Sequence, residues 1–169
     1  MHLYIIRHAI AVEPGAPGYE EDSQRPLTKK GAEKMVNIAR GLREMDVFPD
    51  LIISSPYVRA QETAEILHKE FKLKKNQWVE SETLVPEGLP ADILGEINEK
   101  YSGADSIALV GHEPNLSLLV SLLVVGDASL SINLKKGGVC CLYADNLAHE
   151  RRAALEWLMM PKQLAALGE

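Results

Sequence analysis

Residues 3–8 read Leu3-Tyr4-Ile5-Ile6-Arg7-His8, a short apolar run that ends in two basic side chains. A run of this length with β-branched and aromatic residues is typical of a buried strand. The proline- and glycine-rich residues 14–18 follow shortly afterwards and predict a loop. We therefore expect a strand at the start of the chain that carries Arg7 and His8 at its carboxyl end.

Strand and helix patterns alternate along the rest of the chain. Strands are predicted at residues 51–54, 78–79, 106–110 and 139–143, and helices from the N-cap Thr28 to Met45, over 57–69, around 93–97 and from 114 onward. This alternation predicts an α/β fold with three layers, in which helices cover both faces of a mostly parallel sheet. No linker divides the chain, so residues 1–169 are expected to form a single domain.

Charge and composition exclude several classes of protein. The chain has 18 Lys and Arg against 24 Asp and Glu, a formal net charge of -6, which disfavours a nucleic-acid partner. Its longest apolar run, residues 116–126, falls short of the roughly 20 residues that cross a membrane, and the N-terminus lacks the pattern of a signal peptide. Adjacent Cys140 and Cys141 favour a reducing compartment, so we expect a cytoplasmic protein without a membrane partner.

Basic side chains follow three of the predicted strands at the point where each strand ends. Arg7 and His8 end the first strand, Arg59 lies one turn into the helix after the second, and His112 follows the strand at 106–110. In open α/β sheets ligands collect beyond the carboxyl ends of the strands. Each residue alone could be a surface or capping residue, but guanidinium groups around a neutral imidazole suit a phosphoryl group and a nucleophile.

The same residues lie in segments that resemble the motifs of a known family. Residues 3–9 are similar to the Arg-His-Gly signature of the histidine phosphatase superfamily, with Ala9 at the glycine position. Arg25-Pro26-Leu27-Thr28 with Gly31, Ser54-Ser55-Pro56 through Thr63-Ala64, and Gly111-His112-Glu113-Pro114-Asn115 resemble, in order, the motifs of its SixA-like branch. That branch contains phosphohistidine phosphatases.

The resemblance implies a phosphoglycerate mutase-like fold and a phosphate pocket of Arg7, Arg25, Arg59 and His112 around the nucleophile His8. It implies a covalent phosphohistidine intermediate that water hydrolyses, without a metal or other cofactor. Neighbouring positive charges should keep His8 neutral, and a protonated His112 is expected to help neutralise the phosphoryl group. The resemblance also makes residues 151–160 a strand, although their composition favours a helix.

A general acid for the leaving group is harder to choose from the sequence. Glu82 follows the short strand at 78–79, in the region from which related phosphatases often present a carboxylate, so it is the first candidate. Asp22 and Glu87, in predicted loops, are the competitors, and a solvated surface carboxylate is the ordinary interpretation of each.

The lengths of the connections bear on the substrate. Residues 69–106 have room for one short strand and one helix, so the lid should be minimal and the mouth of the site open. An open mouth favours a phosphoprotein substrate, such as a phosphotransfer domain, with phosphate or another oxyanion in the pocket. A broad small-molecule phosphomonoesterase is the alternative enzyme. A catalytically silent phosphate-binding module is a further alternative, because Ala9 lacks the backbone freedom of glycine.

Overall fold

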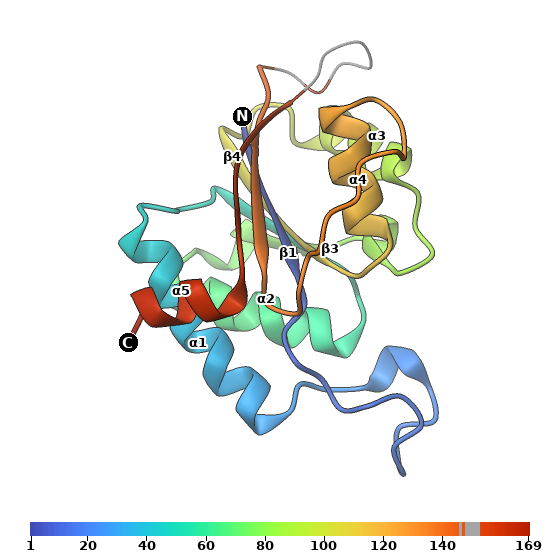
Figure 1. The fold of residues 1–169 in the computed structure, drawn as a ribbon, viewed down its shortest axis with the longest axis vertical. Coiled ribbons are helices and arrows are strands. Elements are labelled where there is room, and N and C mark those ends of the chain that lie inside the picture. The colour runs from blue at the N-terminus through green and yellow to red at the C-terminus, as the bar shows by residue number, and fades with distance from the viewer. Residues whose placement is uncertain (146, 148–152) are drawn as a thin grey trace.

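The computed structural model describes residues 1–145, 147 and 153–169, and its centre is a six-stranded sheet of order β3-β2-β4-β1-β5-β6 (Figure 1). β1 (His2–Arg7), β2 (Leu51–Ser54), β3 (Trp78–Glu80) and β4 (Ser106–Gly111) run parallel. β5 (Val139–Tyr143) and β6 (Ala154–Met159) are antiparallel and complete one edge. The prediction of a mostly parallel sheet is therefore confirmed.

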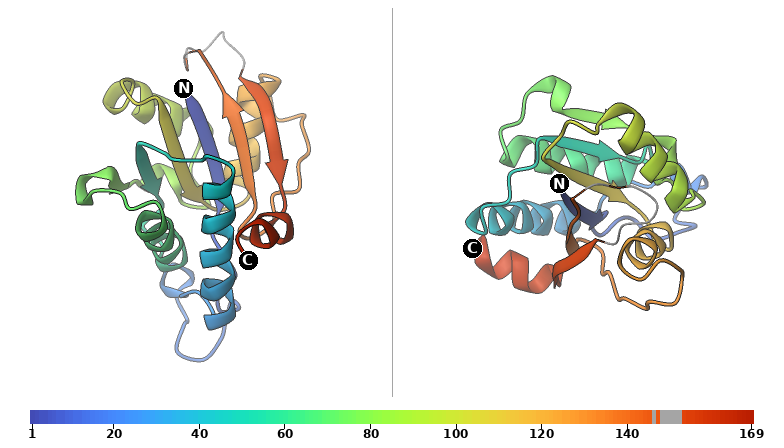
Figure 2. Two further views of the ribbon diagram at one scale, coloured as in Figure 1. Left: turned by 90° about the vertical axis from the view of Figure 1, so that its left-hand side faces the viewer. Right: turned by 90° about the horizontal axis from the view of Figure 1, so that it is seen from above.

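Five helices pack on the described sheet in two layers (Figure 2). α1 (Lys29–Glu44), α2 (Val58–Glu70) and the C-terminal α5 (Pro161–Leu167) cover one face. α3 (Pro90–Lys100) and α4 (Asn115–Val124) cover the other. Short 3-10 turns, η1 (Asp22–Gln24), η2 (Lys75–Gln77) and η3 (Glu82–Leu84), lie in the connections.

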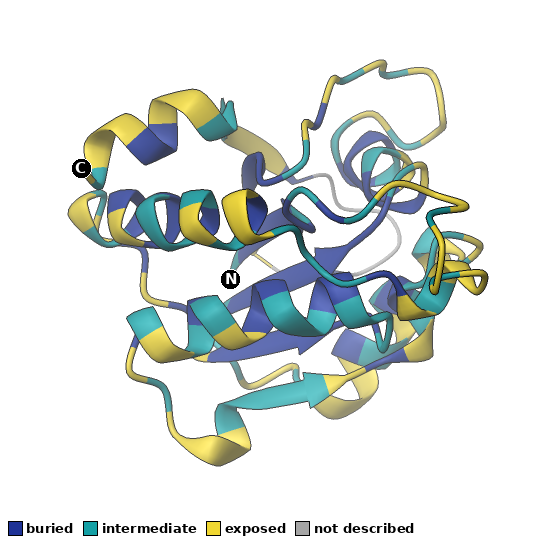
Figure 3. Cartoon of the chain, turned by 90° about the horizontal axis from the view of Figure 1, so that it is seen from below, coloured by how far each residue is buried: buried dark blue, intermediate teal, exposed yellow. Residues whose placement is uncertain are grey.

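The alternation of side chains along β1 divides the core between these layers. Leu3 and Ile5 pack in the cluster with α3 and α4, whereas Tyr4 and Ile6 pack in the cluster with α1, α2 and α5. Because both faces are covered, β1 is apolar at successive positions and not at alternate ones. Figure 3 shows the buried side of the helices turned toward the buried sheet and their exposed side turned outward.

The C-terminal segment decides between two predictions. Residues 154–159 form β6, so the strand implied by the family resemblance is confirmed there, and the helix favoured by composition is wrong; residues 151 and 152 lie outside the described residues. Pairing with β5 outweighs intrinsic propensity at this position. No helix among residues 1–145, 147 and 153–169 combines the length and apolar character that membrane crossing requires.

Candidate active site

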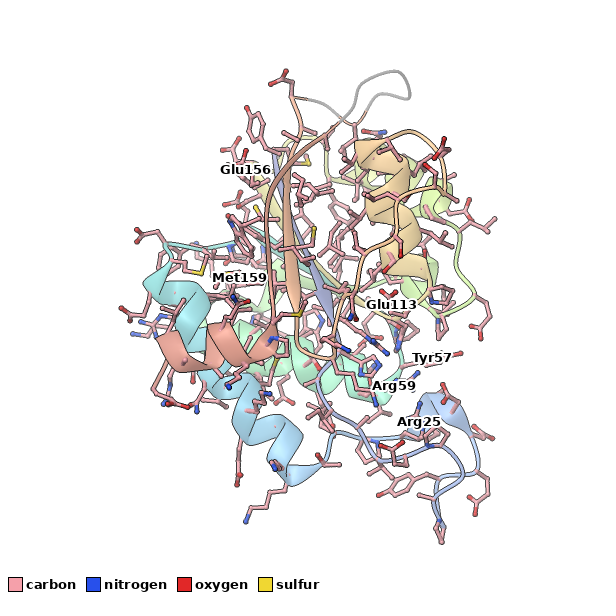
Figure 4. All side chains as sticks on the ribbon, viewed as in Figure 1. Arg25, Tyr57, Arg59, Glu113, Glu156 and Met159 are labelled. Atoms are coloured by element: carbon pink, nitrogen blue, oxygen red, sulfur yellow. The ribbon has the colours of Figure 1, made fainter. Side chains whose placement is uncertain are left out.

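A cavity of about 320 Å³ lies beyond the carboxyl ends of the parallel strands. Its basic and imidazole groups come from the ends of β1 and β4, from the start of α2 and from two loops, and they are Arg7, His8, Arg25, Arg59, His112 and Lys136. Its carboxylates are Glu13, Asp22, Glu87 and Glu113. Figure 4 shows Arg25, Arg59 and Glu113 together at this end of the sheet. The structure thus brings together the five residues predicted for the phosphate pocket and the nucleophile.

The end of β1 fixes both the position and the tautomer of His8. The backbone amide of His8 donates to the Gly111 carbonyl at 3.0 Å, which extends the pairing of β1 with β4. The side-chain Nδ1 lies 2.7 Å from the Ala9 carbonyl oxygen, and because a carbonyl can only accept, Nδ1 carries the proton. The lone pair therefore belongs to Nε2, which accepts from Arg59 Nε at 3.2 Å.

Burial and charge keep this imidazole neutral. His8 is 5% exposed, and burial lowers its pKa from 6.5 to about 3. The Ala9 carbonyl opposes this shift, while the nearby charges of Arg59, Arg7 and Lys136 add to it. An unprotonated Nε2 in a positive environment is the state that a nucleophilic histidine requires.

Asp22 links two of the arginines. Its carboxylate accepts from Arg25 Nε and Nη2 at 2.9 and 2.6 Å through Oδ1, and from Arg59 Nη2 at 2.8 Å through Oδ2. Its backbone carbonyl accepts from Arg59 Nη1 at 2.6 Å. Partial burial raises the pKa of Asp22, but the hydrogen bonds and charges of Arg25 and Arg59 outweigh it and hold the pKa below its usual value.

His112 is positioned by Ser55, which follows β2 directly. Its Nε2 lies 2.9 Å from Ser55 Oγ, and its ring centre is 5.0 Å from that of His8. Burial, followed by the charges of His8 and Arg59, lowers the pKa of His112 from 6.5 to about 2. His112 is therefore neutral in the free site. Its protonation beside a bound phosphoryl group stays a prediction.

Two buried nitrogens of the cavity have no partner among the described residues. They are Nδ1 of His112 and Nε of Arg7, while Arg7 Nη1 donates to the Leu134 carbonyl at 3.0 Å. Buried polar groups are normally paired. Unpaired nitrogens beside a basic cavity are consistent with a ligand that supplies acceptors.

Two α2 residues of the Ser-Ser-Pro to Thr-Ala segment support the site without lining it. Thr63 Oγ1 accepts from the Ala9 amide at 3.1 Å and donates to the Arg59 carbonyl at 2.7 Å, so it joins the end of β1 to α2. Glu62 accepts from the Leu27 amide at 2.6 Å and holds the segment that carries Arg25 against the same helix. Sequence reasoning assigned no role to either residue, although both lie inside a motif that it quoted.

Comparisons with known proteins identify the family of this chain. Residues 3–84 match the histidine phosphatase superfamily (branch 1). An uncharacterized protein of Picosynechococcus is 34% identical over 140 residues, 82% of each chain. The phosphohistidine phosphatase SixA of Escherichia coli is 27% identical over 132 residues, 75% of this chain and 76% of that protein. The chain belongs to the histidine phosphatase superfamily.

A solved structure extends the superfamily likeness to the whole fold. The protein histidine phosphatase SixA in complex with tungstate superposes with a TM-score of 0.82 at 24% identity, covering 97% of this chain and 99% of that one. The likeness covers both the parallel strands and the antiparallel edge. The phosphoglycerate mutase-like fold implied by the sequence motifs is thus confirmed.

Ala9, which departs from the superfamily signature, fits its position without strain. The non-glycine described residues with positive φ are Asp46 and Lys72, so Ala9 does not adopt the backbone conformation that favours glycine. Its side chain is buried in the cluster with α1 and α2, and its amide donates to Thr63. The alanine therefore leaves the tautomer-setting bond of His8 in place.

Of the three carboxylates considered as general acids, Asp22 and Glu87 line the cavity and Glu82 does not. Glu82 is exposed and lines a different hollow beside α3. Asp22 and Glu87 line the cavity, and so does Glu113, which the sequence reasoning did not consider. Among the described residues, no group of three or more His, Cys, Asp and Glu side chains has an arrangement suited to a metal ion.

Proposed function

We propose that this protein is a phosphatase that removes the phosphoryl group from a phosphohistidine protein through a covalent intermediate on His8. The observation that carries the proposal is the state of His8: Nδ1 donates to a carbonyl, and the unprotonated Nε2 lies against Arg59 in a basic cavity. Similarity to proteins named as phosphohistidine phosphatases supports the choice of substrate.

In the first step Nε2 of His8 gives up its hydrogen bond from Arg59 Nε and attacks phosphorus with the freed lone pair. A new N–P bond forms, and the N–P bond of the substrate breaks. The electron pair of that bond leaves with the substrate imidazole, which takes up a proton. An imidazole leaves more readily than an alkoxide, so a strong general acid is not required. In the second step water attacks phosphorus and gives up a proton to solvent. The N–P bond to His8 breaks, its electron pair returns to Nε2, and inorganic phosphate leaves neutral His8.

Arg7, Arg25, Arg59 and His112 bind and neutralise the phosphoryl oxygens in this mechanism. Phosphoryl transfer depends mainly on positioning and charge stabilisation, which fixed guanidinium groups supply. His112 is neutral in the free site, but a bound dianion raises the pKa of a neighbouring imidazole and favours its protonated form. Its unpaired Nδ1 then becomes a donor for a phosphoryl oxygen.

The surroundings of the cavity favour a protein over a small metabolite. Between α2 and β4 the chain adds only η2, β3, η3 and α3. The cavity is bordered by exposed loop residues such as Glu13 and Glu87. A phosphoryl group presented on a protein surface, for example by a phosphotransfer domain, can reach such a site directly.

The test is a substrate panel with the purified chain. Phosphohistidine on a phosphotransfer domain is compared with phosphoserine and phosphotyrosine proteins and with free phosphosugars. We expect preferential hydrolysis of phosphohistidine and an acid-labile phosphoryl adduct that is lost in His8→Ala. His68→Ala is the matched control, because His68 lies outside the cavity and contacts the Lys74 carbonyl.

Each alternative predicts a different result in this panel. Comparable turnover of phosphosugars and phosphohistidine protein would identify a broad phosphomonoesterase. Oxyanion binding without turnover or adduct would identify a silent phosphate-binding module. Either result would overturn the proposed activity.

A further inference from the structure

The side chain of Asp22 accepts hydrogen bonds from two of the arginines that line the cavity. The side chain of Asp22 is 52% exposed, whereas those of Arg25 and Arg59 are 9% and 4% exposed. Each carboxylate oxygen of Asp22 accepts from a different guanidinium group. A single exposed anion thus joins two buried cations.

This pairing uses the donors that a phosphoryl group would need. All three nitrogens of Arg59 are engaged, Nε with His8 and both Nη atoms with Asp22. All three nitrogens of Arg25 are engaged as well, Nε and Nη2 with Asp22 and Nη1 with the Val12 carbonyl. An oxyanion that binds the N–H groups now taken by Asp22 must therefore compete with its carboxylate.

The position of Asp22 allows it to yield to such a ligand. It belongs to η1, a turn of three residues without a buried member. Its displacement would not open the hydrophobic core, because the Asp22 side chain is half exposed and Arg25 keeps its bond to the Val12 carbonyl. The cost of displacement is mainly the loss of charge-assisted hydrogen bonds.

We propose that Asp22 is a built-in competitor of the ligand, which weakens the binding of every oxyanion to Arg25 and Arg59, so that only an oxyanion with a strong attraction to the cavity displaces it. The inference rests on the proposed function and extends it. A terminal phosphoryl group carries two charges and three oxygens, so it can replace a carboxylate on both arginines. A phosphodiester, a sulfate ester or a free carboxylate carries one charge, so it gains little by displacing another monoanion.

Direct binding tests the inference without relying on turnover. Isothermal titration calorimetry measures tungstate and inorganic phosphate as dianions, and dimethyl phosphate and methyl sulfate as monoanions. Asp22→Asn removes the charge and keeps the shape. Glu21→Gln is the matched control. It also removes one negative charge, and Glu21 is the exposed N-cap residue next to Asp22.

We expect Asp22→Asn to bind the monoanions about tenfold more tightly than wild type, the scale of one charge-assisted hydrogen bond. The dianions should gain affinity by a similar factor, because both classes of anion displace the same carboxylate, and neither class should gain affinity in Glu21→Gln. Asp22→Ser, measured in parallel with circular dichroism, provides a second variant should the amide disturb η1.

Two outcomes would overturn the inference. Unchanged monoanion affinity in both Asp22 variants would show that the carboxylate does not compete. Weaker binding of every oxyanion would show that Asp22 only positions the arginines. Neither outcome depends on catalysis, so a failed substrate panel together with tighter anion binding in Asp22→Asn would refute the proposed activity and leave this inference standing.

Discussion

Acid should destabilise this protein through the two imidazoles of the cavity, His8 and His112, before most carboxylates titrate. Each has a reference pKa of 6.5, lowered to about 3 in His8 and about 2 in His112. The unfolded chain therefore binds more protons below pH 6.5, so stability is present above that value and is lost as the pH falls. Between pH 7.5 and 5 each imidazole removes about 2 kcal/mol of unfolding free energy, and the pair about 4 kcal/mol.

Urea denaturation at several pH values, in buffers free of phosphate and sulfate, measures this loss. Over the same pH range, the unfolding free energy of the double variant His8→Asn and His112→Asn should fall by about 4 kcal/mol less than that of wild type. For each single variant it should fall by about 2 kcal/mol less. The subtraction cancels the contribution of carboxylates. Ser55→Ala is the control, since it removes the partner of His112 but keeps both imidazoles. Equal pH dependence in wild type and double variant would refute the reasoning.

Three further predictions concern the supports of the site and its protonation. Thr63→Val leaves the Ala9 amide without its acceptor, so the unfolding free energy should fall by about 1–3 kcal/mol in urea denaturation; an unchanged value would contradict the role assigned to Thr63. Gly41→Ala would place a Cβ 1.9 Å from the Leu164 carbonyl oxygen, so α5 must move. We expect a loss of about 1–3 kcal/mol, and an unchanged thermal midpoint would contradict it. Nitrogen NMR of His8 should show the neutral ring with the proton on Nδ1 down to about pH 5, and a doubly protonated ring at that pH would disprove this assignment.

The sequence predicts most of the fold because local patterns and long-range packing agree there. β1 is a continuous apolar run that lies between two helical layers, and α1 begins where Thr28 caps it through the Gly31 amide. α5 was not predicted, because it is short and depends on close contact with α1, where the Leu164 carbonyl approaches Gly41. A contact between residues so far apart in the chain leaves no periodic pattern in either segment.

The candidate site shows the same division between local and long-range information. The ends of β1 and β4 place His8 and His112 at one edge, and this juxtaposition follows from strand order alone. The bond between Asp22 and Arg59 depends on how the loop after β1 folds back onto α2. The sequence pattern presents Asp22 as one loop carboxylate among several and therefore does not predict its pairing.

The charge state of the site is a property of the fold more than of the motifs. The sequence places cations beside His8 and His112, which predicts some lowering of the pKa of His8, but burial is the larger cause for both rings. The two rings are buried because they follow the ends of β1 and β4, where α2 and the loop after β1 surround them. In the free cavity, therefore, both imidazoles are neutral, and Arg25 and Arg59 are bound to the Asp22 carboxylate. Entry of a dianion reverses both conditions at once, because it displaces Asp22 and favours a proton on His112.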